Sequence, residues 1–68
     1  GIMNGLNLEQ VRVRVVGQQS SDAVRVLKNE GFNYVGTAYP VVVWRKGFQE
    51  VELHFWQGRV SRVEKVEV

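Results

Sequence analysis

The alternation of apolar and polar residues predicts that the chain begins with a β-strand. In residues 8–16, valines at positions 11, 13 and 15 alternate with polar residues, among them Arg12 and Arg14. A period of two over this length is typical of a half-buried strand. Gly17-Gln18-Gln19 then interrupts the pattern.

Residues 20–29 are predicted to form a short helix. Ser20-Ser21-Asp22 offers a capping hydroxyl and a negative charge for the first turn. Gly31 follows the last turn, where a left-handed residue is favoured, and Phe32 is placed to fold back on Leu27 in a Schellman arrangement. A helix of about three turns is not stable alone, so we expect it to pack on the sheet.

The second half of the chain predicts a meander of β-strands. An extended run at 32–39 is followed by strands at 41–46, 49–56 and 59–68, with tight turns at Lys46-Gly47 and Gln57-Gly58. Pro40 cannot donate to a ladder, so the chain bends there or runs along an edge. The spacing of Val60 and Val63 departs from alternation, which predicts a bulge or a strand that frays after Val63.

The loop at Lys46-Gly47 leaves two registers open. A two-residue turn places Trp44 on the buried face beside Val51, whereas a three-residue loop turns Trp44 and Lys46 outward and buries Val41 and Val43. We prefer the three-residue loop because it buries more valine.

These elements predict an α+β fold: a small, twisted, mostly antiparallel sheet of four to five strands, with one short helix on one face. The order is strand, helix, then four strands, and the first strand, helix and second strand can form a right-handed crossover. The 68 residues make a single domain, in which residues 1–6 are expected to be disordered or left over from cloning. Because so short a chain buries only about 60% of its unfolded surface, dimerisation is an obvious way to enlarge the core.

The sheet face away from the helix is the candidate binding surface. The turn at Gln57-Gly58 sets Trp56 opposite Arg59 and His54 opposite Ser61, and the first strand adds its arginines. The candidate residues are Arg12, Arg14, Trp44, Lys46, His54, Trp56 and Arg59. Exposed rings beside arginines suit single-stranded nucleic acid, because each stacked base contributes about 1–3 kcal/mol.

Two other interpretations of this face stay open. Trp56 and Arg59 can form a cross-strand pair that only stabilises the hairpin, and Glu50 and Glu52 on the same face would repel phosphates or neutralise the arginines. The same face, or an edge strand, can also bind a protein partner or a second copy of the chain. We therefore expect a small binding or regulatory module without enzymatic activity, whose ligand is either nucleic acid or protein.

Catalytic and metal-ion chemistry find little support in the composition. The chain has one histidine and no cysteine, which is too few for a zinc site and leaves no convincing nucleophile–base pair. Because no phosphate-binding glycine motif is present either, we expect no cofactor. No run of about 18 apolar residues occurs, and the lack of cysteine fits a reducing compartment, so a cytoplasmic location without membrane association is expected. The net charge of +2 permits an anionic partner without requiring one.

Overall fold

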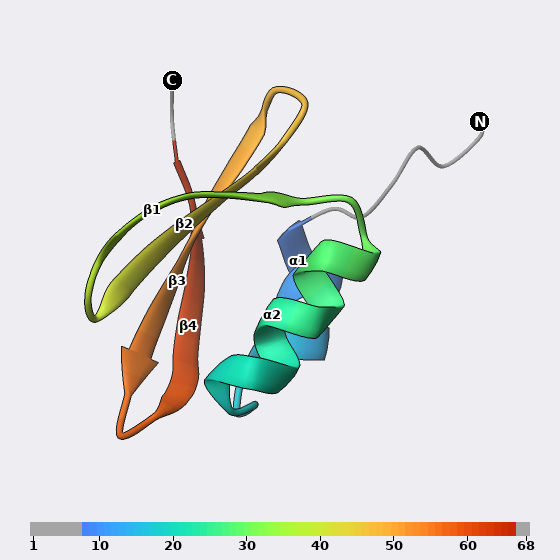
Figure 1. Ribbon diagram of the computed structural model, residues 1–68. Helices are drawn as coiled ribbons and strands as arrows, with labels where there is room; N and C mark the ends of the chain where they lie inside the picture. The colour runs from blue at the N-terminus through green and yellow to red at the C-terminus, as the bar shows by residue number, and fades with distance from the viewer. Residues whose placement is uncertain (1–7, 67–68) are drawn as a thin grey trace.

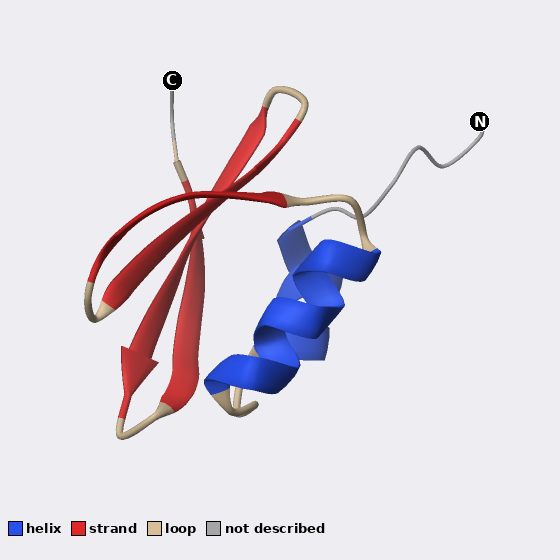
Figure 2. Ribbon diagram, in the orientation of Figure 1, coloured by secondary structure: helices blue, strands red, loops and turns tan. Residues whose placement is uncertain are grey.

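Residues 8–66 are described by a computed structural model in which two helices precede a four-stranded sheet (Figure 1). The elements are α1 (Leu8–Val15), α2 (Ser20–Asn29), β1 (Asn33–Ala38), β2 (Val41–Lys46), β3 (Gln49–Trp56) and β4 (Arg59–Lys65). The strands lie side by side in chain order, and each neighbouring pair is antiparallel. Both helices lie on one side of the sheet (Figure 2). The α+β class is confirmed, while the prediction for residues 1–6 lies outside the described residues.

The predicted first strand is wrong, because residues 8–15 form helix α1. Val11 and Val15, four residues apart, share one helical face and are buried, whereas Val13 is 81% exposed. A strand would have turned all three valines to the same side. Packing of α1 against α2 and β4 outweighs the modest preference of valine for strands. The crossover and the fifth strand that depended on this segment are therefore absent from the described chain.

Helix α2 forms where it was predicted, with a different N-terminal cap. The capping position is Gln19, whose side chain makes no capping hydrogen bond, and the serines lie inside the first turn. At the other end Gly31 adopts a φ of 94°, which costs glycine little. The Gly31 N–H donates to the Lys28 carbonyl at 3.0 Å and the Phe32 N–H to the Leu27 carbonyl at 2.9 Å, as in a Schellman motif.

The register between β2 and β3 differs from both predicted alternatives, because the loop is neither Lys46-Gly47 nor Lys46-Gly47-Phe48. Trp44 nevertheless faces the core, as the two-residue alternative predicted. Lys46 pairs with Gln49 and Trp44 with Val51, so the loop consists of the two residues Gly47-Phe48. Trp44 is therefore only 2% exposed and lies in the core. A buried aromatic side chain removes about 150–250 Å² from water, so the burial of Trp44 contributes strongly to the stability of this register.

The last hairpin confirms the predicted turn and bulge. Trp56 pairs with Arg59 across Gln57-Gly58, while the register shifts by one residue beyond Phe55 and Val60. The shift makes Ser61 the extra residue, so His54 pairs with Arg62 and the predicted pairing of His54 with Ser61 is wrong. Because of this bulge Val60 and Val63, although three apart, are both buried.

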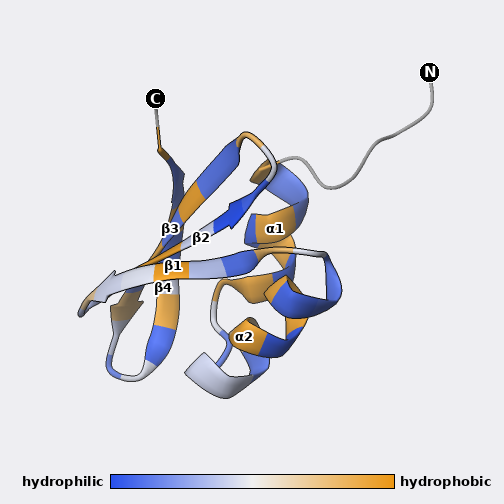
Figure 3. Ribbon diagram, turned by 45° about the horizontal axis from the view of Figure 1, so that its top comes forward, coloured by the Kyte–Doolittle hydropathy of each residue, from blue (hydrophilic) through white to orange (hydrophobic). Residues whose placement is uncertain are grey.

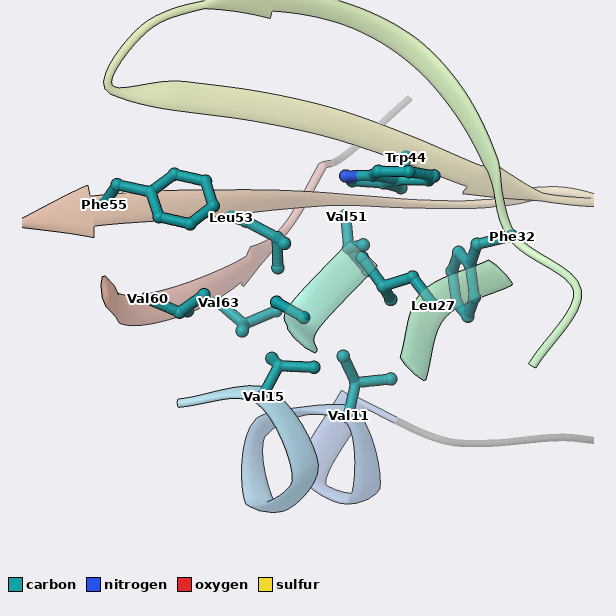
Figure 4. Close-up of a cluster of buried hydrophobic side chains, with 11 residues drawn as sticks. Val11, Val15, Leu27, Phe32, Trp44, Val51, Leu53, Phe55, Val60 and Val63 are labelled. Atoms are coloured by element: carbon teal, nitrogen blue, oxygen red, sulfur yellow. The ribbon is translucent and has the colours of Figure 1, made fainter. Parts of the chain in front are cut away.

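The core lies between the inner face of the sheet and the two helices. Alternate residues of β3 (Val51, Leu53 and Phe55) point toward the helices (Figure 4). The helices contribute Val11, Val15 and Leu27 to the same buried cluster. Along both helices hydrophobic residues alternate with hydrophilic ones, which is expected of helices with one buried side (Figure 3).

Candidate functional site

Three of the predicted binding residues gather on the sheet face away from the helices. His54 and Trp56 alternate with the buried residues of β3, and Arg59 lies opposite Trp56. Trp56 is 70% exposed. The Arg59 guanidinium donates to the Gly17 carbonyl at 2.9 Å, so part of its hydrogen-bonding capacity already serves the linker between the helices.

Six ionisable side chains on this outer face form three pairs. Arg45 binds Glu50 at 2.9 Å, and His54 Nε2 lies 3.1 Å from a Glu52 oxygen. Arg62 and Glu64 are 3.8 Å apart. The carboxylates of Glu50, Glu52 and Glu64 therefore lie beside basic side chains of this face and would repel an approaching phosphate.

The remaining predicted residues lie elsewhere. Arg12 and Arg14 are on α1, where Arg12 pairs with Glu9 at 2.6 Å and Arg14 with Glu30 at 2.9 Å. Trp44 is buried, and the Lys46 ammonium lies 5.9 Å from the centre of the Phe32 ring. The structure therefore brings together only His54, Trp56 and Arg59 of the predicted set.

The two edges of the sheet differ in how they are covered. At β4, Val60 exchanges backbone hydrogen bonds with the interhelix linker, donating to Gln18 at 2.9 Å and accepting from Gly17 at 2.8 Å. Farther along β4, Arg12 Nε donates to the Val63 carbonyl at 3.1 Å. At β1, no other strand or linker of the described chain pairs with the outer side. Strand β1 is therefore the open edge.

Exposed apolar side chains gather at this open edge. Tyr34, Val35 and Tyr39 are all exposed, and Tyr39 stacks on Phe55 with ring centres 6.1 Å apart. The hairpin that carries them turns at Tyr39-Pro40, which confirms the bend expected at the proline. The register with β2 shifts at Val35, which is therefore a bulge residue.

A groove of about 410 Å³ separates β1 and β2 from α2. One wall is the α2 face that carries Ser20, Val24 and Lys28, each one helical turn from the next. The sheet supplies the other wall, made of Tyr34, Thr37, Val42, Trp44 and Phe55. The hydroxyl groups of Tyr34 and Thr37 form a hydrogen bond of 2.5 Å with each other.

A buried donor without a partner adjoins the groove. Trp44 Nε1 has no hydrogen-bond acceptor among the described residues, although nearly all buried polar groups find one. Figure 4 shows this nitrogen on the side of the indole that points toward Phe55, which also lines the groove. The Lys28 ammonium makes no ion pair or hydrogen bond with residues 8–66.

Sequence reasoning missed both the open edge and the groove. Pro40 was a correct signal for an edge, but the strand beside it could not be identified as terminal while a first strand was expected at residues 8–16. The groove depended on the register that buries Trp44, and no local pattern decided that register.

Comparisons of the chain with protein-family models, curated proteins and solved structures found no match. Within residues 8–66 no group of three acidic or histidine side chains is arranged to hold a metal ion. Neither described helix has the length and apolar character needed to cross a bilayer.

Proposed function

We propose that the domain is a non-enzymatic protein-association module whose β1 edge pairs with β1 of a second copy. The observation that carries this proposal is the asymmetry of the sheet: β4 is covered by the linker and Arg12, whereas β1 is open in the described chain. An exposed strand edge offers unpaired N–H and C=O groups to another strand.

The composition of β1 favours self-pairing. Its six residues, Asn33–Ala38, include no charged side chain. Antiparallel pairing with an identical strand therefore brings no like charges together, and it places exposed Tyr34 and Val35 of both copies near one another. Natural edges that avoid pairing usually carry lysine or other charges.

The covered β4 edge limits the assembly to two copies. Pairing across a two-fold axis uses the same strand of each partner, and the far edge of each sheet is occupied at Val60 and Val63. The short strand and its bulge at Val35 make the interface small, so we expect a dissociation constant on the order of 10 μM.

Nucleic acid is the less supported partner. Arg12 and Arg14, which were expected to share the face of Trp56, lie on α1. On the outer face Arg45 and Arg62 stand beside carboxylates, and Arg59 donates to the Gly17 carbonyl. A module for single strands needs a continuous basic track beside its aromatic rings.

Sedimentation equilibrium over a wide concentration range tests the proposal. Wild-type protein is expected to rise from the monomer mass of 7.8 kDa toward twice that value. Val35→Lys places a positive charge on each strand near the two-fold axis and is expected to remain monomeric. Circular dichroism confirms that the variant is folded.

Val13→Lys is the matched control, because it makes the same change at an exposed valine on α1. It is expected to dimerise like wild type. A wild-type mass that stays at 7.8 kDa at every concentration would overturn the proposal. Dimerisation of folded Val35→Lys equal to that of wild type would exclude β1 as the interface.

A further inference from the structure

We infer that the groove between α2 and the β1–β2 hairpin is a binding site for a small linear carboxylic acid, a function separate from association at the β1 edge. The inference rests on two independent features of the groove. One is the buried indole N–H of Trp44, which lacks an acceptor among the described residues, and the other is the Lys28 ammonium, which has no ion-pair partner within residues 8–66.

The walls of the groove suit an apolar chain. Val24 of α2 faces Val42 and Phe55 of the sheet, and all three are apolar side chains that line the same space. The volume of about 410 Å³ falls within the range of about 300–1,000 Å³ that is usual for small-molecule sites. An alkyl chain in this space would lie against Val24 and Val42, which are both half-buried.

The polar groups stand at one end of the groove. Lys28 is two helical turns from Ser20, at the end of α2 that precedes Gly31, and Trp44 lies two residues beyond Val42 along β2. Val42 pairs with Leu53, and Trp44 pairs with Val51. Phe55 lies two residues beyond Leu53 along β3, on the side away from Trp44, so it marks the opposite end of the groove. A ligand with its charged group at the Lys28 end therefore extends its chain along Val42 toward Phe55.

A carboxylate is the group that matches these donors. One oxygen can accept from the Trp44 N–H, which then no longer remains unsatisfied, and the other can pair with Lys28. A neutral head group would leave Lys28 unused, and an amine would meet a like charge. Since Lys28 is exposed, the carboxylate keeps part of its hydration, which limits the cost of binding it beside apolar walls.

Titration of ¹⁵N-labelled protein with sodium octanoate, below the concentration at which it forms micelles, tests the site by NMR. The expected result is a saturable downfield shift of the Trp44 indole N–H, while the indole N–H of exposed Trp56 stays in place. Acetate has the charge without the chain and is expected to produce no saturable shift. 1-Octanol has the chain without the charge and is expected to bind about tenfold more weakly than octanoate.

Lys28→Gln is expected to weaken octanoate binding about tenfold and to leave 1-octanol binding unchanged. Lys65→Gln, on β4 away from the groove, is the matched control and is expected to bind octanoate like wild type. No saturable shift of the Trp44 indole up to about 10 mM octanoate, which is the weak limit for a small ligand of this size, would overturn the inference. Equal binding of octanoate and 1-octanol, or an equal loss in both lysine variants, would also overturn it. The titration reports on a groove that lies within one copy of the chain, so its outcome does not depend on whether the protein dimerises.

Discussion

At the scale of single residues, Leu53 is the strongest test of the core. Its side chain is fully buried in the cluster that joins β3 to both helices (Figure 4). We expect Leu53→Ala to lower the free energy of unfolding by about 3 kcal/mol, because it removes apolar burial and leaves a cavity. Val13→Ala, at an exposed position on α1, should change it by less than about 0.5 kcal/mol. Urea denaturation followed by tryptophan fluorescence measures both, and equal losses would contradict the assignment of the core.

Gln57 offers a residue-scale test of the last hairpin. Its φ is 54°, and Gly58 follows with a φ of 79°, so both residues of the turn are left-handed. Asparagine tolerates this region better than glutamine, and Asn-Gly is the preferred pair for such turns. We expect Gln57→Asn to raise the free energy of unfolding by about 0.5 kcal/mol. The same substitution at Gln18, whose φ is not positive, should give no gain. Thermal unfolding compares the two variants.

The residues that sequence reasoning placed correctly are those governed by near neighbours. Gly31 and Phe32 were predicted from the order of residues at a helix end, and Gln57-Gly58 from a turn pair between two alternating runs. Trp44 was misplaced because its orientation follows from the start of the loop, and shifting the loop by one residue reverses both faces of β2. Burial of the indole in the core cluster that it shares with Leu27 and Phe32 favours the observed register, and that cluster joins segments far apart in the chain.

At the scale of whole elements, the start of α2 is a correctable weakness. Gln19 occupies the capping position with an extended backbone, and its side chain makes no hydrogen bond to the first turn. An aspartate there can accept from a free N–H and adds a negative charge at the positive end of the helix dipole. We expect Gln19→Asp to raise the free energy of unfolding by about 1 kcal/mol, measured by urea denaturation. Gln18→Asp adds the same charge one residue earlier, so an equal gain there would show that general electrostatics, and not capping, is responsible.

The element that sequence reasoning missed was α1. Its valines alternate as in a strand, yet Val11 and Val15 also fit one side of a helix, and eight residues do not distinguish the two periods. The choice depends on what each face can pack against. In the structure the helix places Val11 and Val15 beside α2 and β4, while Arg12 caps the edge of β4.

At the scale of the whole molecule, moving the first segment from the sheet to the helical layer separates the predicted binding residues. Arg12 and Arg14 leave the outer face, and only His54, Trp56 and Arg59 remain there. The same change leaves β1 as the open edge of the sheet, and the burial of Trp44 forms one wall of the groove. Both proposed sites therefore depend on tertiary arrangement and could not be predicted from local patterns.

The distribution of charge predicts that the molecule binds single-stranded nucleic acid weakly. With a net charge of +2 and carboxylates beside most of its arginines, few phosphates can be neutralised at once. We expect a labelled mixed-sequence strand to bind with a dissociation constant of about 100 μM or weaker at physiological salt, and with a shallow salt dependence. Fluorescence anisotropy measures both quantities.

The comparison of Trp56→Ala with Phe48→Ala makes this last prediction specific to the outer face. Both aromatic side chains are exposed, but Trp56 lies opposite Arg59 in a strand pair, whereas Phe48 lies in the loop between β2 and β3. If the outer face does not stack bases, neither substitution changes the weak binding. Tight binding, at about 1 μM, that Trp56→Ala and Arg59→Ala abolish and Phe48→Ala preserves would contradict the prediction. It would make the hairpin of β3 and β4 a nucleic-acid surface, because stacking on Trp56 would then outweigh the neighbouring carboxylates.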